Sequence, residues 1–428
     1  MAGKSERSSY IDAFRGFAIL AVLFHHFFYR QIAAAYPFDA SRLLSPAAIN
    51  HGHLGVGLFF ILSGMVFYRP NIADDWGKVL RFYFQRALRL WPLYILTILL
   101  LGYLKQYDLF TFAKSFALLL TGIHDFIPKY WEPSWALWVL WSLGVEIIFS
   151  ISLPGLLLAE RRLGLARVLI LAVVFCFVYR IVGDHVWMTR HPDYPNPFIN
   201  PLKDNFIGRL DDFLFGMAAM RAVRNGVTIR SACGWLALPG LLLVGYSWSY
   251  LEAVPRGWPQ SVLASANHTG FAICSVTLIL AVRRSKIWDS WASQPFVFAG
   301  TVCYSAYVIH ALLLSNMDWP KGLDLETLLA FGRFAFGTLL LSAISFATIE
   351  AIGIRHLPAW AQWTRLFRGG SSVLNLAIWH KCNPIFPRRT IDGNWTGLAQ
   401  TWRRQRKDGK WEYRRDEPTV DDWSNRQY

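Results

Sequence analysis

The sequence predicts an all-α, polytopic integral membrane protein, because three of its features fit a bundle of apolar helices. Of its 428 residues, 54% are hydrophobic and only 17% are charged, against about 25% charged in a typical soluble protein. The chain contains 20 tryptophans, a residue type that collects at membrane–water interfaces. Apolar runs recur along most of its length, which favours one large membrane bundle over several soluble domains.

Eleven apolar runs approach the length of about 20 residues that a membrane-spanning helix needs. In chain order these runs lie at 11–29, 54–68, 88–104, 109–124, 135–158, 165–183, 206–223, 232–251, 262–282, 295–315 and 327–350.

Basic residues indicate which of these runs cross, because Lys and Arg collect in cytoplasmic loops. Three runs separate the basic segments 69–89 and 159–167, and two segments on the same side require an even number of crossings. The run 109–124 begins with polar residues and contains Lys114, so we expect a re-entrant or interfacial helix there. About ten crossings remain, with both termini in the cytoplasm.

Hydropathy falls sharply near residue 360, which divides the chain into two parts. We expect a transmembrane domain over 1–355 and a basic, tryptophan-containing cytoplasmic tail over 356–428. The formal net charge is +15, but the cations are spread over many loops and the tail. They do not form the single basic face that nucleic-acid binding requires, so we expect no nucleic-acid partner.

The first apolar run carries a cation and a histidine on one stripe. Arg15 and His26 are eleven residues apart, which is about three helical turns, or roughly 16 Å along the axis. A histidine can act as a general base near neutral pH, and an arginine can meet an anionic group. A packing histidine and a snorkelling arginine are the structural alternative. His25 points about a quarter-turn away.

Two further spans carry charged residues of interest. Arg86 and Arg89 are three apart and share one helix face, where they could bind the phosphates of an anionic cofactor or anchor the span. Glu146 lies deep in an apolar run. It could orient His26 or bind acceptor hydroxyls, and a structural ion pair, for instance with Arg209, is the alternative.

Polar and small residues mark two other spans. Tyr304, Tyr307 and His310 form a polar strip that could bind substrate, together with Trp141, or form interhelical hydrogen bonds. The segment 55–64 has small residues that allow close helix packing. The sequence contains no P-loop, HExxH or GxSxG motif, and we expect no metal.

In these same motifs the sequence resembles the acyltransferase 3 family of membrane O-acyltransferases, over about residues 10–350. The motifs are Asp12-Ala-Phe-Arg15-Gly16 with His26, Gly55 to Gly64, Arg86-x-x-Arg89 with Pro92 and Tyr94, Trp141 to Glu146, Phe213-Leu-Phe-Gly216, Tyr304 to His310, and Glu350. Gly57, Ile147 and Cys303 depart from the family pattern, so the resemblance assigns no role to these three positions.

The resemblance implies an O-acetyltransferase of the cell inner membrane. It implies acetyl-CoA as a cytoplasmic donor, an envelope glycan such as O-antigen or exopolysaccharide as acceptor, and polysaccharide-assembly proteins as partners. His26 would be the catalytic base, with Arg15, Arg86 and Arg89 near the donor and Glu146 as a second functional residue. The alternative function is a transporter or flippase for a glycan or lipid-linked sugar, which would work without CoA.

Overall fold

The computed structural model describes twelve separate stretches of the chain, which fall in two compact units, Met1–Gly370 and Ser371–Tyr428. The described residues are 9–36, 41, 51–104, 122, 140–191, 200–254, 257–315, 317, 322–350, 396–398, 401–405 and 411–414. The expected domain boundary at 355/356 and nearly all of the run 109–124 lie outside these residues.

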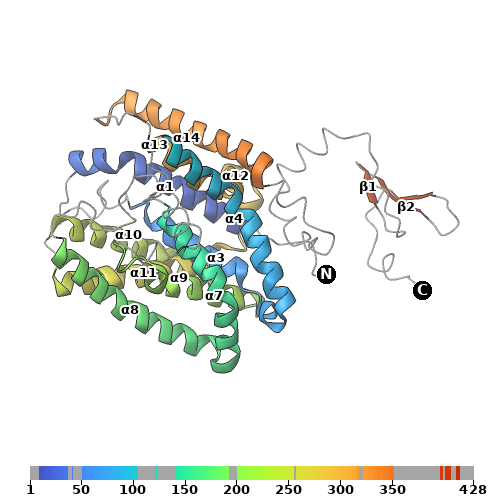
Figure 1. The fold of residues 1–428 in the computed structure, drawn as a ribbon, viewed down its shortest axis with the longest axis horizontal. Coiled ribbons are helices and arrows are strands. Elements are labelled where there is room, and N and C mark those ends of the chain that lie inside the picture. Colours follow the sequence, from blue (N-terminus) through green and yellow to red (C-terminus); the bar gives the residue numbers. More distant parts are fainter. Residues whose placement is uncertain are drawn as a thin grey trace. The chain divides into compact units, whose positions relative to one another are not determined.

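The first unit is a bundle of helices (Figure 1). Figure 1 shows α1, α13 and α14 along one side of this bundle and α8, α10 and α11 along the opposite side. The α-helices are α1 (Ser9–Ala35), α3 (Leu54–Phe67), α4 (Trp76–Leu104), α7 (Trp141–Leu163), α8 (Leu165–Arg190), α9 (Phe206–Arg224), α10 (Ser231–Ala253), α11 (Trp258–Val282), α12 (Gln294–Thr301), α13 (Cys303–Ser315) and α14 (Leu325–Ser345). Short 3-10 segments are η1 (Pro70–Asp74), η4 (Lys286–Asp289) and η5 (Trp291–Ser293), and the π-helical η6 is Phe346–Glu350.

The bundle has the character of an integral membrane protein. Six helices of the described part are long and apolar enough to cross a bilayer, and a seventh span is obtained if α12 and α13 are counted as one broken helix. Helix α3 is apolar but only 14 residues long. Polytopic helical architecture is therefore confirmed for the first unit, whereas the expected count of about ten crossings is not.

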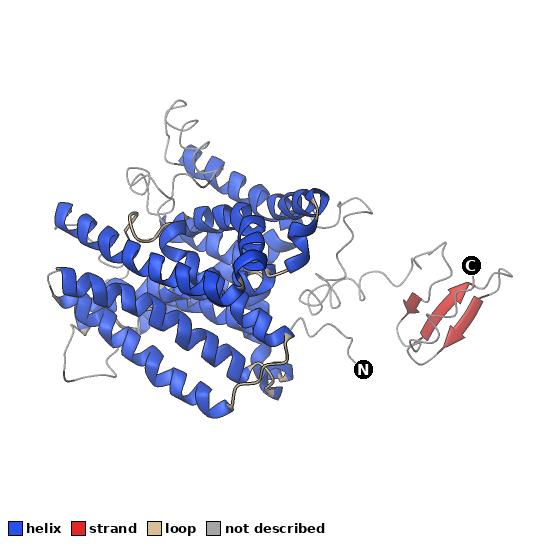
Figure 2. Ribbon diagram, turned by 90° about the horizontal axis from the view of Figure 1, so that it is seen from below, coloured by secondary structure: helices blue, strands red, loops and turns tan. Residues whose placement is uncertain are grey.

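The second unit contains strands, which the sequence reading did not predict. Three short strands, β1 (Thr396–Leu398), β2 (Thr401–Gln405) and β3 (Trp411–Arg414), form an antiparallel sheet in the order β1-β2-β3 (Figure 2). Thr396 pairs with Arg403 across the first ladder, and Gln405 pairs with Trp411 across the second. The all-α description therefore applies to the bundle and not to this unit.

Glycines allow the helices around the centre of the bundle to approach closely. Helices α3 and α9 cross at Gly64 and Gly216, where an added Cβ would overlap a main-chain carbonyl oxygen of the opposite helix. Helices α1 and α12 cross in the same way at Gly16 and Gly300. Small residues permit such backbone contact in membrane bundles, so close packing is confirmed for the glycine-containing segment 55–64.

Two irregularities interrupt the helices that flank the centre. The long run predicted at 295–315 is broken at Val302, where the axes of the two helical pieces differ by 68°. Helix α14 ends in the π-helical turn η6, whose buried Glu350 accepts a hydrogen bond from Ser305 of α13. Breaks and π-turns in apolar helices occur frequently at functional sites.

Candidate functional site

His26 on α1 and His310 on α13 form a hydrogen-bonded pair. Nδ1 of His26 lies 3.0 Å from Nε2 of His310, and the two rings are nearly parallel, with 5° between their planes. His310 is completely buried, whereas His26 is half-buried. The histidine that the helical spacing selects is thus held from one side by a second histidine.

The hydrogen bonds around His310 determine which nitrogen of neutral His26 is available. Nδ1 of His310 lies 3.1 Å from the carbonyl oxygen of Ala306, and that oxygen can only accept, so Nδ1 of His310 carries the proton. Nε2 of His310 then accepts from Nδ1–H of His26. We infer that Nε2 of His26 is unprotonated, which is the state that a general base requires.

Arg86 on α4 and Glu146 on α7 form a buried ion pair. One guanidinium nitrogen of Arg86 lies 2.6 Å from Oε1 of Glu146, and the side chains are 9% and 20% exposed. Ser63 of α3 donates to the same carboxylate oxygen at 3.3 Å, and Nε of Arg86 donates to Ser150 at 3.2 Å. The guanidinium also lies over the Phe67 ring at 4.2 Å. This network joins three helices.

A narrow cavity of about 60 Å³ lies beside this ion pair. Five of the eight predicted site residues line it, namely Arg15, Arg86, Arg89, Glu146 and Tyr304. The side chains come from α1, α4, α7 and α13, so the cavity collects residues that are up to 292 positions apart in the sequence, from Arg15 to Tyr307. Its wall carries three arginines and one glutamate, and it therefore has a net positive lining.

The three arginines of this cavity differ in their partners. Arg86 is neutralised by Glu146, and Arg15 lies 3.8 Å from Asp12 of its own helix. Arg89 is half-buried and makes no ion pair with any residue that the structure describes. Arg89 is therefore the cation of the cavity that remains available to an anionic ligand.

Tyr307 connects the cavity with the histidine pair. Its ring lines the cavity and lies 5.4 Å, centroid to centroid, from the His310 ring. Its hydroxyl accepts a hydrogen bond of 2.7 Å from Ser142, which also lines the cavity. The neighbouring Tyr304 donates to the carbonyl oxygen of Leu90 on α4, so the polar strip of α13 does form interhelical hydrogen bonds.

Three expectations about single residues differ from the observed contacts. Glu146 bonds to Arg86 and Ser63 among the described residues, and His310 occupies the orienting position beside His26. Arg209, named as an alternative partner of Glu146, instead pairs with Asp204 and Asp212. The Arg86–Glu146 and His26–His310 contacts join helices distant in sequence, which the apolar pattern cannot specify, whereas Arg209 pairs with near neighbours along the chain.

Trp141 and His25 lie apart from the cavity wall. Trp141 is 3% exposed and packs edge-on against Phe60 at 6.0 Å, which makes it part of the aromatic core. His25 is buried against the rings of Tyr29 and His53. The two adjacent histidines of α1 thus have different surroundings, as their angular separation on the helix predicts.

A second buried polar cluster was not anticipated from the sequence. Asp211 receives two hydrogen bonds from Arg180, at 2.8 and 2.9 Å, and Lys203 pairs with Asp184 at 3.1 Å. The only sequence feature that could have indicated this cluster is the presence of charged residues near the ends of the predicted spans. In the described stretches, no group of three or more His, Cys, Asp and Glu side chains could hold a metal ion.

Most of the chain is similar to a known protein family and to a curated protein. The sequence matches the protein family described as "Acyltransferase domain" (acyltransferase 3) over residues 8–349. It is 23% identical over 371 residues to BcsY of Komagataeibacter xylinus, whose name describes a membrane-bound transacylase. The alignment covers 81% of this chain and 83% of BcsY. No solved structure matches the chain significantly.

Proposed function

Because the chain belongs to the acyltransferase 3 family and is a membrane acyltransferase, we propose that it transfers an acetyl group from cytoplasmic acetyl-CoA to a hydroxyl group of a cell-envelope carbohydrate. The observation that carries this proposal is the His26–His310 pair next to a cavity lined by Arg89, which has no ion-pair partner among the described residues. Together they supply a base for a hydroxyl group and a cation for an anionic donor.

In this proposal the donor enters from the cytoplasmic side, where the distribution of Lys and Arg over the loops leads us to place both termini and the basic loops. Arg89 binds a phosphate of the donor, and Arg15 adds a second cation at the same cavity. Arg86 contributes less charge than the sequence suggested, since Glu146 neutralises it. We assign the Arg86–Glu146 pair to positioning, because it fixes α4 against α7 and so places Arg89.

His26 acts as the general base in the proposed reaction. Its Nε2 takes the proton of the acceptor hydroxyl, and the hydroxyl oxygen attacks the thioester carbonyl carbon. A new C–O bond forms, the C–S bond breaks, and the proton passes from Nε2 to the departing sulfur to give the free thiol. His310 holds the reactive tautomer of His26 by accepting from its Nδ1–H, and it is therefore a positioning residue.

The acceptor is proposed as a glycan of the cell envelope, at the inner membrane and in company with polysaccharide-assembly proteins. The support is the position of His26. Because this base is only half-buried, a hydroxyl group can reach it from outside the bundle. Acyl transfer itself agrees with the name of BcsY.

The proposal is tested with membranes that contain the wild-type protein, radiolabelled acetyl-CoA and an envelope-glycan fraction. We expect label to enter the glycan as an alkali-labile ester, and we expect no ester when CoA-free acetate replaces the donor. A glycan transporter would instead move unmodified glycan without CoA. Transport without ester formation, with every acceptor fraction tried, would refute the proposed acyltransferase function.

The donor site is tested by Arg89→Gln with Arg190→Gln as a matched control. Arg190 is an exposed arginine at the end of α8, away from the cavity. Loss of one charge-assisted contact should raise the KM for acetyl-CoA about tenfold and leave kcat almost unchanged. Equal KM values for the two variants would exclude Arg89 as a donor ligand.

A further inference from the structure

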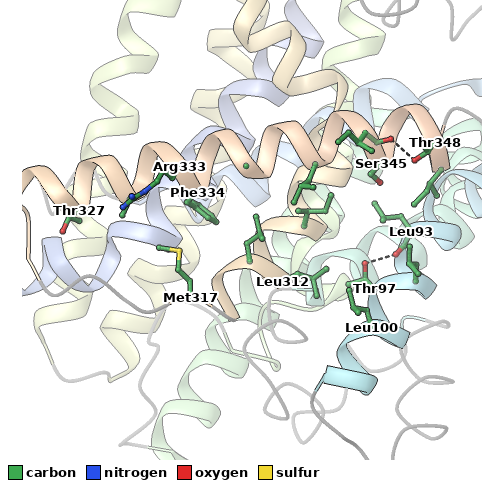
Figure 3. Close-up of a pocket in the computed structure, with 18 of the residues that line it drawn as sticks. Leu93, Thr97, Leu100, Leu312, Met317, Thr327, Arg333, Phe334, Ser345 and Thr348 are labelled. Atoms are coloured by element: carbon green, nitrogen blue, oxygen red, sulfur yellow. Dashed lines mark hydrogen bonds between the residues drawn. The ribbon is translucent and has the colours of Figure 1, made fainter.

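A long apolar groove runs between α4, α13 and α14, outside the cavity described above (Figure 3). Its volume is about 1350 Å³, larger than the roughly 300–1,000 Å³ of typical small-molecule pockets. Leucines and isoleucines of the three helices form most of its wall, including Leu93, Leu100, Leu312 and Leu341. The lining residues of α14 and the following turn η6 extend from Glu326 to Ile349, which is roughly 34 Å of helix at 1.5 Å per residue.

One mouth of this groove carries an arginine that no carboxylate in the described part of the chain neutralises. Arg333 of α14 is exposed, lines the groove, and forms no ion pair with a described residue. Figure 3 shows its side chain extending from the helix toward Thr327, that is, toward the beginning of α14. This is the direction expected for an arginine in a membrane span that reaches toward the head-group region.

Two carboxylate side chains lie at the same mouth of the groove. Asp324 and Glu326 both line the groove and are both exposed. Asp324 caps α14 by accepting from the Thr327 amide at 2.8 Å, and this backbone hydrogen bond holds the pKa of Asp324 below its ordinary value, so that the carboxylate stays ionised. Among the described residues that line it, the mouth therefore presents one cation and two anions above an apolar channel.

We propose that this groove binds a phospholipid with a primary-amine head group, of the phosphatidylethanolamine class. Its phosphate lies on Arg333, its ammonium lies on Glu326 and Asp324, and a hydrocarbon chain fills the apolar channel along α14. A guanidinium matches a phosphate, and an ammonium can donate three hydrogen bonds to carboxylates.

The charges at the mouth distinguish this lipid from its common alternatives. A phosphatidylglycerol carries a net negative charge without a cation, so the two carboxylates repel it. A phosphatidylcholine has a cation but no N–H donor for Glu326. The proposed site does not depend on acyl transfer, because it is separate from the cavity and is defined by lipid binding alone.

The proposal is tested by native mass spectrometry of the full chain in detergent, titrated with dioleoyl phosphatidylethanolamine, phosphatidylcholine and phosphatidylglycerol. We expect one phosphatidylethanolamine per chain, bound about tenfold more tightly than phosphatidylglycerol. Arg333→Gln should weaken that binding about tenfold, and Glu326→Gln should remove the preference over phosphatidylcholine.

A glycine pair on α14 gives a matched control for the channel itself. An added Cβ meets no atom within 4 Å at either Gly337 or Gly332, but only Gly337 lines the groove. Gly337→Leu should therefore remove the bound lipid, whereas Gly332→Leu should bind as the wild type does. Equal lipid binding by these two variants, or phosphatidylglycerol binding as tightly as phosphatidylethanolamine, would overturn the proposal.

Discussion

Replacing Glu146 with glutamine should strongly destabilise the bundle, because it leaves the Arg86 guanidinium without its counter-charge. The Arg86 side chain is 9% exposed and lies 2.6 Å from the carboxylate. Ser150 and the Phe67 ring remain as contacts of Arg86, but neither carries a negative charge. Removing one partner of a buried pair costs about 3–5 kcal/mol of unfolding free energy, and we expect that range here.

Neutralising both residues should be less damaging than the sum of the single changes. In Arg86→Gln/Glu146→Gln no charge is left buried, so a coupling free energy of about 2 kcal/mol or more is expected between the two sites. The assay is denaturant unfolding of the detergent-solubilised protein, followed by the fluorescence of its 20 tryptophans. Wild type, both single variants and the double variant complete the cycle.

Asp74→Asn provides the control for this cycle. Asp74 forms ion pairs with Lys78 and Arg161, but all three side chains are at least 40% exposed, and exposed pairs contribute little to stability. Glu146→Gln should therefore be much more destabilising than Asp74→Asn. Strict additivity of the Arg86 and Glu146 changes would refute the reasoning, as would a Glu146→Gln protein as stable as the control.

Three further predictions concern other parts of the bundle. His310→Ala should lower kcat about 10–100-fold without changing the KM for acetyl-CoA, and His310→Gln, which still offers an acceptor oxygen, should retain more activity in a steady-state assay. Gly16→Leu should destabilise by at least about 1–3 kcal/mol in the same unfolding assay, because its side chain overlaps the main chain of α12, whereas Gly155→Leu, which meets no atom within 4 Å, should not. Hydrogen bonds from Arg161 and then Lys78 lower the pKa of Asp74 from 3.8, so its contribution to stability is present above that value and is lost as the pH falls through the lowered pKa. Thermal unfolding of wild type and Asp74→Asn should accordingly differ by a constant amount above about pH 5 and converge in acid.

Sequence patterns predicted the helical architecture and part of its packing. Apolar runs located most of the helices of the bundle, and the glycines of 55–64 indicated close helix contact, which Gly64 makes with α9. The break at Val302 was not predicted, because the run around it contains no proline and no charged residue at that point. The strands of the second unit were missed since their segment lacks a strong alternating pattern.

Helical spacing could predict which residues share a face but not which residues meet across the bundle. It placed Arg15 and His26 on one stripe of α1. The partner of His26 lies 284 positions away and that of Arg86 lies 60 positions away, and such distant contacts depend on tertiary packing. Hydropathy makes any carboxylate in an apolar span a candidate to orient His26, so the sequence predicts that role for Glu146 and substrate binding for His310.

The central claim, that His26 is the base for acyl transfer, is tested most directly by comparing His26→Ala with His25→Ala. Initial rates of ester formation from acetyl-CoA are measured with purified proteins, normalised to the folded fraction on size-exclusion chromatography. We expect His26→Ala to lower kcat about 10²–10⁴-fold, which is the usual contribution of a general base. We expect the kcat of His25→Ala to stay within about tenfold of the wild type, because His25 is not the base and loss of a base lowers kcat by more than that. Equal rates for wild type and His26→Ala would contradict the account.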